Sequence, residues 1–139
     1  MSNIFAATAL LALIGSAVSA ANSQQNLTAA AQVAEGRSLF VTYCASCHGA
    51  SGRGDGPVGQ DFRVPPADLT QLAKHYDGVF VSAKMERIID GRDVKAHGNV
   101  EMPIWGDVFK RREGLSEEAV KTRIKAIVKF LESIQERSS

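Results

Sequence analysis

The sequence predicts an all-α protein, and three features of the chain support this class. Apolar residues recur at steps of three or four over residues 33–43 and again over residues 120–134, which is the spacing of one helical face. No stretch of any length alternates apolar and polar side chains as a half-buried strand does. The 12 glycines and four prolines gather mainly after residue 48, which predicts long loops between the helices.

The first and the last predicted helix each carry one apolar face. In the first helix this face contains Val33, Gly36, Phe40 and Tyr43. A glycine inside a helix costs about 1 kcal/mol relative to alanine, so its presence on the apolar face indicates that another helix crosses closely there. The last helix begins after an N-cap at Ser116 and ends near residue 136. It is the natural partner of the first helix, because it carries a stripe of Val120, Ile124, Ile127, Leu131 and Ile134.

Loops and short helices fill the sequence between these two. The glycine-dense stretch from Gly49 to Pro57 predicts a tightly turning loop. A short helix follows, with Asp68 as its N-cap. A further helix is predicted over residues 79–90, and Gly91 would end it.

Residues 107–115 form a longer connection before the last helix. It contains three consecutive basic side chains, Lys110, Arg111 and Arg112. Such a run is usually a solvated face, and a role in docking a partner is the alternative, since charge patches steer encounters.

The bulk composition describes one ordinary globular domain. The 139 residues carry a formal net charge of +1, which gives no reason to expect nucleic acid or a membrane surface as a partner.

Residues 1–20 predict a signal peptide for export. An apolar run fills positions 4–14, and small residues follow where a signal peptidase cleaves. No Lys or Arg precedes the run, so an uncleaved membrane anchor is the alternative. We expect residues 21–31 to be a flexible lead-in and residues 32–137 to form the folded domain.

The motif C-x-x-C-H, formed by Cys44, Cys47 and His48, carries the chemistry of the chain. It is the attachment signature of a c-type haem. Two thiols at this spacing can each add across one vinyl group of the same porphyrin edge, and the adjacent histidine then gives the iron an imidazole nitrogen. These are the only two cysteines in the chain, so none remains for a structural disulfide.

Three other interpretations of the motif remain. A zinc site usually needs four Cys or His ligands in two pairs, and His75 and His97 do not form a usual second pair. A redox dithiol follows a strand in a βαβ pattern, whereas the residues before Cys44 indicate a helix. A motif without function on a loop is the third possibility.

Met102 is the candidate for a second iron ligand. A residue before proline does not belong in a helix interior, so Met102, which precedes Pro103, lies in an irregular segment. Its thioether is a soft ligand, and His/Met ligation raises the potential of a haem. A buried methionine filling a gap is the alternative, and His97 is a lesser candidate for the ligand.

Two further residues are assigned supporting roles. Pro57 has a carbonyl free to accept a hydrogen bond, and a ligating histidine normally donates its second ring N–H to such an acceptor. Trp105, the only tryptophan, is predicted to cover an open side of the haem with its N–H on a propionate, and burial without that contact is the alternative.

In these motifs the chain resembles the class I c-type cytochromes, a family of soluble single-haem proteins. The resemblance rests on the haem signature, the loop ending at Gly56 and Pro57, and the stretch Met102-Pro103-x-Trp105-Gly106. It implies a small cytochrome c fold, with the first and last helices crossing and the haem in a crevice between helices and long loops. It also implies one heme c attached through Cys44 and Cys47, with His48 and Met102 as metal ligands.

The expected function is therefore electron transfer and not catalysis. The resemblance implies a periplasmic monomer that shuttles single electrons between redox proteins, such as a membrane oxidase, a reductase or a periplasmic dehydrogenase. A membrane would be a partner only if residues 1–20 stay attached. The alternatives are a haem-bearing subunit of a respiratory or dehydrogenase complex, and a haem enzyme or gas sensor whose distal site opens.

Overall fold

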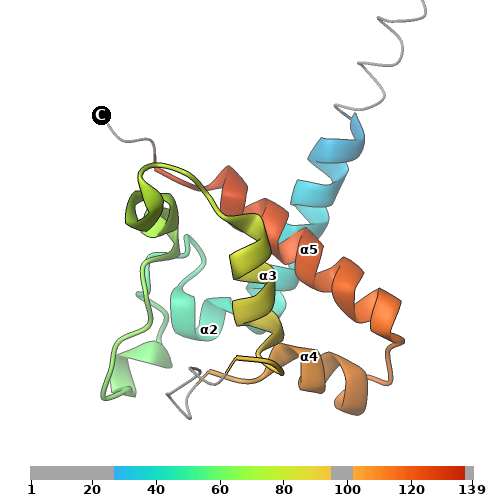
Figure 1. Ribbon diagram of the computed structural model, residues 1–139. Helices are drawn as coiled ribbons and strands as arrows, with labels where there is room; N and C mark the ends of the chain where they lie inside the picture. Colours follow the sequence, from blue (N-terminus) through green and yellow to red (C-terminus); the bar gives the residue numbers. More distant parts are fainter. Residues whose placement is uncertain (1–26, 95–101, 137–139) are drawn as a thin grey trace, which may run out of the picture. The chain divides into compact units, whose positions relative to one another are not determined.

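The computed structural model describes residues 27–94 and 102–136. Every regular element in these two ranges is helical (Figure 1), so the predicted all-α class is confirmed. The compact unit that carries the core begins at Gln32. Among the described helices, none is both long enough and apolar enough to cross a membrane. The predicted signal peptide and His97 lie outside the described residues.

The helices follow one another in a simple order. The first helix covers residues 27–43. After it come the short helix α2 (Ala45–His48), the 3-10 helices η1 (Gly59–Asp61) and η2 (Leu69–Tyr76), α3 (Ser82–Asp90), α4 (Trp105–Asp107), the π-helix η3 (Val108–Arg112) and α5 (Glu117–Ser133). Residues 27–31, which the sequence predicts to be a flexible lead-in, are helical because strong helix formers such as Ala29, Ala30 and Ala31 fill them.

The first helix and α5 cross in close contact, as Gly36 predicted. A Cβ atom placed on Gly36 would lie 1.9 Å from the carbonyl oxygen of Ala126, so only a glycine lets the two backbones approach this closely. Beside this point the rings of Phe40 and Phe130 lie 5.1 Å apart between centroids. Figure 1 shows the part of the first helix from residue 32 onward passing behind α5.

Helix α5 supplies most of the core. Its N-cap is Ser116, whose hydroxyl oxygen accepts a hydrogen bond from the Ala119 N–H at 3.2 Å. The predicted stripe is buried except for Ile134, which is half-buried just beyond the last helical residue, Ser133. The helix therefore ends earlier than predicted. The core of the described chain consists of Phe40, Met85, Ile89, Phe109, Val120, Ile124, Ile127, Val128, Phe130 and Leu131.

Helix α3 is shorter than the sequence predicted. It begins at Ser82 and not at residue 79. Val81, directly before it, does not have helical backbone angles (φ −92°, ψ 82°), in keeping with the low helix propensity of β-branched residues. The predicted stop is confirmed, because Gly91 adopts φ 72° and donates its N–H to the Arg87 carbonyl.

The segment before α5 is more ordered than predicted. Residues 105–112 form α4 and η3 in place of an irregular connection, and Phe109 within them is completely buried. Two of the three basic side chains have acidic partners on this chain, because Lys110 pairs with Glu117 and Arg111 with Asp107.

Candidate functional site

The signature residues share one turn at the end of the first helix. The N–H of Cys44 donates to the Phe40 carbonyl at 2.8 Å, which continues the first helix into the motif. The carbonyl of Cys44 then accepts hydrogen bonds from the N–H groups of Cys47 (3.2 Å) and His48 (2.9 Å). Both cysteines are free and half-buried. This turn therefore presents two thiols and one imidazole together, as attachment of one porphyrin edge requires.

His48 is held by a backbone acceptor. Its Nδ1 lies 3.1 Å from the carbonyl oxygen of Ala67. If Nδ1 carries the proton, Nε2 is the nitrogen left to bind iron. Burial lowers the pKa of the His48 imidazole, and the Ala67 bond opposes this shift. A lowered pKa favours the neutral form, which is the form that ligates a metal.

The acceptor found for His48 is not the predicted one. The sequence analysis assigns this role to Pro57, whereas the structure gives it to Ala67, further along the same loop. The role of Pro57 beside a ligated histidine remains a prediction.

Burial also affects the first thiol of the motif. It raises the pKa of Cys44 to about 12, with a smaller contribution from the neighbouring Cys47. Cys44 is therefore a thiol at neutral pH, the form that carries the hydrogen needed for addition of S–H across a vinyl group.

The glycine-rich loop wraps closely around the signature turn. Gly56 and Gly54 donate their N–H groups to the carbonyls of Cys47 (3.1 Å) and His48 (2.8 Å). A Cβ atom on Gly56 would lie 2.5 Å from the carbonyl carbon and oxygen of Cys47. The loop thus satisfies carbonyls that the short helix leaves free at its C-terminal end, and it does so only because side chains are absent.

Met102 lies half-buried in irregular backbone shortly before α4. This agrees with the predicted break before Pro103, while the role of Met102 as an iron ligand remains a prediction. Trp105, at the start of α4, belongs to an aromatic cluster with Tyr43 and Phe109. Ring centroids are 5.5 Å apart for Trp105 and Tyr43, 5.6 Å for Trp105 and Phe109, and 5.1 Å for Tyr43 and Phe109.

The aromatic cluster links the two predicted haem-binding segments. Tyr43 directly precedes the signature, and Trp105 closely follows Met102. Phe109, which joins them, was not predicted from the sequence. The sequence feature that could have indicated a buried side chain here is the apolar pair Val108 and Phe109 inside an otherwise charged stretch. The predicted contact of Trp105 with a propionate remains a prediction.

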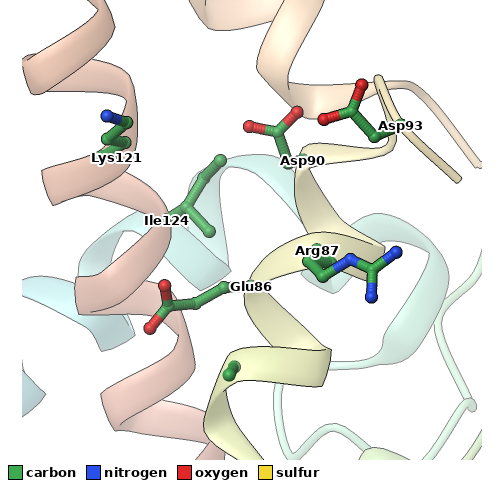
Figure 2. A pocket seen from close by; sticks show the side chains of 7 residues that line it. Glu86, Arg87, Asp90, Asp93, Lys121 and Ile124 are labelled. Carbon is green, nitrogen blue, oxygen red and sulfur yellow. The ribbon is translucent and has the colours of Figure 1, made fainter.

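A cavity of about 360 Å³ opens between α3 and α5 (Figure 2). Its lining includes none of the signature residues, so this cavity is separate from the predicted site of haem attachment. It is lined by Ala83, Glu86, Arg87, Asp90, Asp93, Lys121 and Ile124.

The donor set and the fold together fit a covalently bound haem. Two free thiols and a neutral imidazole lie on one helical turn, the loop beneath them is shaped by glycine, and the first and last helices cross as in a small cytochrome c domain. These features define the class of c-type cytochromes.

The comparison with known families gives the same class. Residues 31–131 match the family described as cytochrome c oxidase, cbb3-type, subunit III, and the chain belongs to this family. No curated protein and no solved structure matches the chain. The predicted class of c-type cytochrome is thereby confirmed, and with it haem-based electron transfer as the general function of the domain.

Proposed function

We propose that this chain is an exported carrier that transfers single electrons between redox proteins through one haem c bound to Cys44 and Cys47. The observation that carries the proposal is the turn in which both thiols and His48 lie together, with Nδ1 of His48 beside the Ala67 carbonyl. Bound haem supplies an iron that alternates between the ferric and ferrous states. The residues of the chain hold it, and thioether bonds from two cysteines keep it in place in both states.

His48 and Met102 are proposed as the two side chains that would bind the haem iron. The half-burial of Met102 and its place in irregular backbone support this role. A thioether ligand together with an imidazole ligand would raise the reduction potential of a bound haem. If both side chains bind the iron, no open ligand position would remain for a substrate, so the proposed protein is a carrier and not an enzyme. Pro57 and Trp105 are proposed to support this site.

Mass spectrometry of the exported protein tests the attachment. We expect a mature chain that begins after residue 20 and carries the mass of one haem. The Cys47→Ser variant should lose most of its stable haem, because only one thioether can form. A colourless mature protein from cells that attach haem to another c-type cytochrome would contradict the proposal.

Carbon monoxide separates the proposed carrier from a haem enzyme or gas sensor. It binds reduced haem only where an axial position is open. We expect the reduced wild-type protein to bind it slowly at neutral pH and the Met102→Ala variant to bind it rapidly. Rapid binding by the wild-type protein would favour an enzyme or sensor.

A second candidate function is a fixed haem-bearing subunit of a respiratory oxidase complex. The description of the matching family favours it. An intact N-terminal segment and co-purification with a large membrane subunit after detergent extraction would support this candidate. Recovery of the processed chain alone in the periplasmic fraction would support the shuttle.

A further inference from the structure

The C-terminal turn of α3 packs against the segment that follows Met102. A Cβ atom on Gly91 would lie 3.3 Å from Cγ2 of Ile104 and 3.4 Å from its Cα. A Cβ atom on Gly106 would lie 2.5 Å from Nε of Arg92 and 2.6 Å from Oδ1 of Asp90. The backbone at Gly106 therefore lies directly against the Asp90–Arg92 pair, and no side chain separates them.

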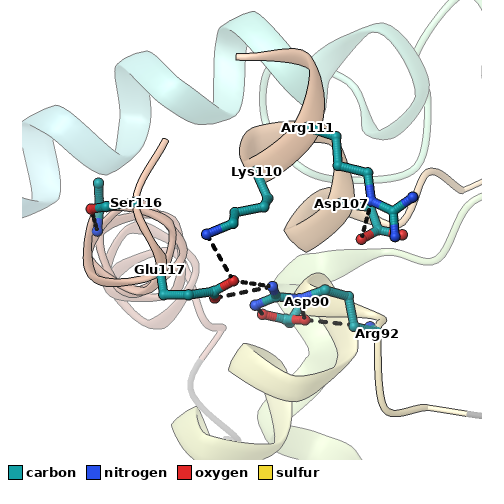
Figure 3. Close-up of polar contacts among 8 residues, drawn as sticks. Asp90, Arg92, Asp107, Lys110, Arg111, Ser116 and Glu117 are labelled. Atoms are coloured by element: carbon teal, nitrogen blue, oxygen red, sulfur yellow. Dashed lines mark hydrogen bonds and ion pairs between the residues drawn. The ribbon is translucent and has the colours of Figure 1, made fainter. Parts of the chain in front are cut away.

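Arg92 is fixed by two carboxylates (Figure 3). Its Nε and Nη2 donate to Oδ1 (2.7 Å) and Oδ2 (2.8 Å) of Asp90, a two-point contact that sets the plane of the guanidinium. Its Nη1 donates to both oxygens of Glu117 at 3.1 and 3.0 Å. Lys110 reaches the same carboxylate at 3.2 Å. We call Asp90, Arg92, Lys110 and Glu117 the Arg92 cluster.

The Arg92 cluster joins three helices, and its Asp90–Arg92 pair is partly shielded from water, whereas the side chains of Lys110 and Glu117 are 41% and 49% exposed. Asp90 ends α3, Glu117 begins α5 and Lys110 belongs to η3. The side chains of Arg92 and Asp90 are 26% and 24% exposed, whereas that of Arg111 in its surface pair is 77% exposed. The two-point, charge-assisted contact between Asp90 and Arg92 is therefore stronger than an exposed ion pair.

The same segment is also held through Trp105. The Trp105 ring contacts Tyr43 of the first helix and Phe109 of η3. Ile104, Trp105 and Gly106 thus each have a separate contact, which fixes the backbone shortly after Met102.

We propose that the Arg92 cluster is a positioning device that keeps the Met102 thioether on the haem iron. The inference rests on the proposed function, in which Met102 is a ligand. Met102 stands four residues before Gly106, so a fixed backbone at Gly106 limits the conformations that its side chain samples. If the cluster is lost, the segment gains freedom and the methionine-bound state becomes less populated.

Imidazole titration of the oxidised, haem-loaded protein measures this effect. Imidazole must displace the methionine, so its apparent affinity rises as the methionine bond weakens. The sulfur-to-iron charge-transfer band reports the same event. We expect Arg92→Gln to bind imidazole at least about tenfold more tightly than the wild type, because it loses the charge-assisted bonds that hold the cluster.

Two further variants distinguish the positioning effect of Arg92 from the effect of its positive charge. Arg92→Lys keeps the charge but cannot form the two-point contact, so it should also bind imidazole more tightly. Arg111→Gln removes the same charge from an exposed pair with Asp107, and its imidazole affinity should match the wild type. Far-UV circular dichroism confirms that each variant is folded under the titration conditions. If Arg92→Gln does not accumulate as folded protein, Arg92→Lys carries the test.

The inference would be overturned if both Arg92 variants bound imidazole with the wild-type affinity. It would also be overturned if the imidazole affinity of Arg111→Gln rose as much as that of the Arg92 variants. Failure of the proposed function gives a different result. In that case the wild-type protein lacks the charge-transfer band, and Met102→Ala binds imidazole with the wild-type affinity.

Discussion

Gly36 of the first helix lies against the carbonyl oxygen of Ala126 in α5, so closely that a Cβ atom at residue 36 would come within 1.9 Å of that oxygen. The neighbouring atom belongs to helical backbone and cannot turn aside as a flexible side chain would. The crossing of the first and last helices therefore depends on the absence of one methyl group.

Gly36→Ala should destabilise the protein by about 3 kcal/mol, because overpacking forces two helix backbones apart. At an exposed helix position the same change would stabilise the protein by about 1 kcal/mol. The sign of the change in the free energy of unfolding therefore shows whether the two helix backbones are in close contact at Gly36. Urea unfolding followed by circular dichroism measures the difference. Ser38→Ala, exposed in the same helix, is the control and should leave the midpoint nearly unchanged.

Gly56→Ala should damage the haem site by sterics alone. Its Cβ atom would lie 2.5 Å from backbone atoms of Cys47 and Ser46, and we expect a loss of about 3 kcal/mol in the free energy of unfolding. Gly114→Ala is the matched control. Gly114 has φ 70° but nothing within 4 Å of its Cβ position, so only a conformational cost of about 1 kcal/mol remains. Equal losses in the two variants would argue against the close wrapping of the loop.

Met102→Ala should leave the haem attached and remove its sulfur ligand. The charge-transfer band of the oxidised protein should vanish. The reduction potential should fall by on the order of 0.2 V, within the roughly 0.8 V range that axial ligands span. Met85→Leu is the control, because Met85 is buried in the core and a swap that conserves volume costs less than about 1.5 kcal/mol. A band that survives in Met102→Ala would exclude Met102 as the ligand.

In the Asp90→Asn variant, the free energy of unfolding should depend less on pH in the acid range than it does in the wild type. Hydrogen bonds from Arg92 hold the pKa of Asp90 below its ordinary value, against the opposing effect of burial. The ionised carboxylate therefore stabilises the folded state above the unfolded pKa of about 3.9, and this contribution is lost as the pH falls through the lower folded pKa.

At pH 7 we expect Asp90→Asn to be less stable than the wild type by about 2 kcal/mol, and this gap should narrow below about pH 4. Urea unfolding at pH 7 and pH 3 measures it. Asp107→Asn, at an exposed pair, should cost less than about 1 kcal/mol at either pH. If the variant and the wild type differed in stability by the same amount at both pH values, the charge of Asp90 would not contribute to the stability of the fold.

Features that depend on a local pattern of residues could be predicted from the sequence alone. The apolar stripe of α5, the helix stop at Gly91 and the glycine loop after His48 all follow from periodicity or from backbone conformations that few residues adopt. Even the helix crossing was predictable, since a glycine on an apolar helical face costs helix stability and is favourable only where another backbone comes close.

Features that depend on contacts between distant segments were not predictable. Ala67 lies well beyond His48 in the chain, and nothing in its own sequence marks it as the acceptor. Residues 105–112 are too short and too charged to show a helical period, yet the burial of Phe109 against Tyr43 and Trp105 orders them. Arg92 stands in a stretch whose sequence indicates only a polar loop, because its role appears only when Asp90 and Glu117 are brought to it.

The stretch between Gly59 and Pro66 is closed at its base, because its two ends touch. A Cβ atom on Gly59 would lie 2.5 Å from Cγ of Pro66, and residues 60–65 between them are nearly all exposed. Doubling the length of a loop whose ends are already in contact costs only about 0.6 kcal/mol in chain entropy. The same Cβ position on Gly59 lies 2.6 Å from the carbonyl oxygen of Cys47, so a fluorescent label inserted into this exposed stretch would report from directly beside the haem-attachment turn.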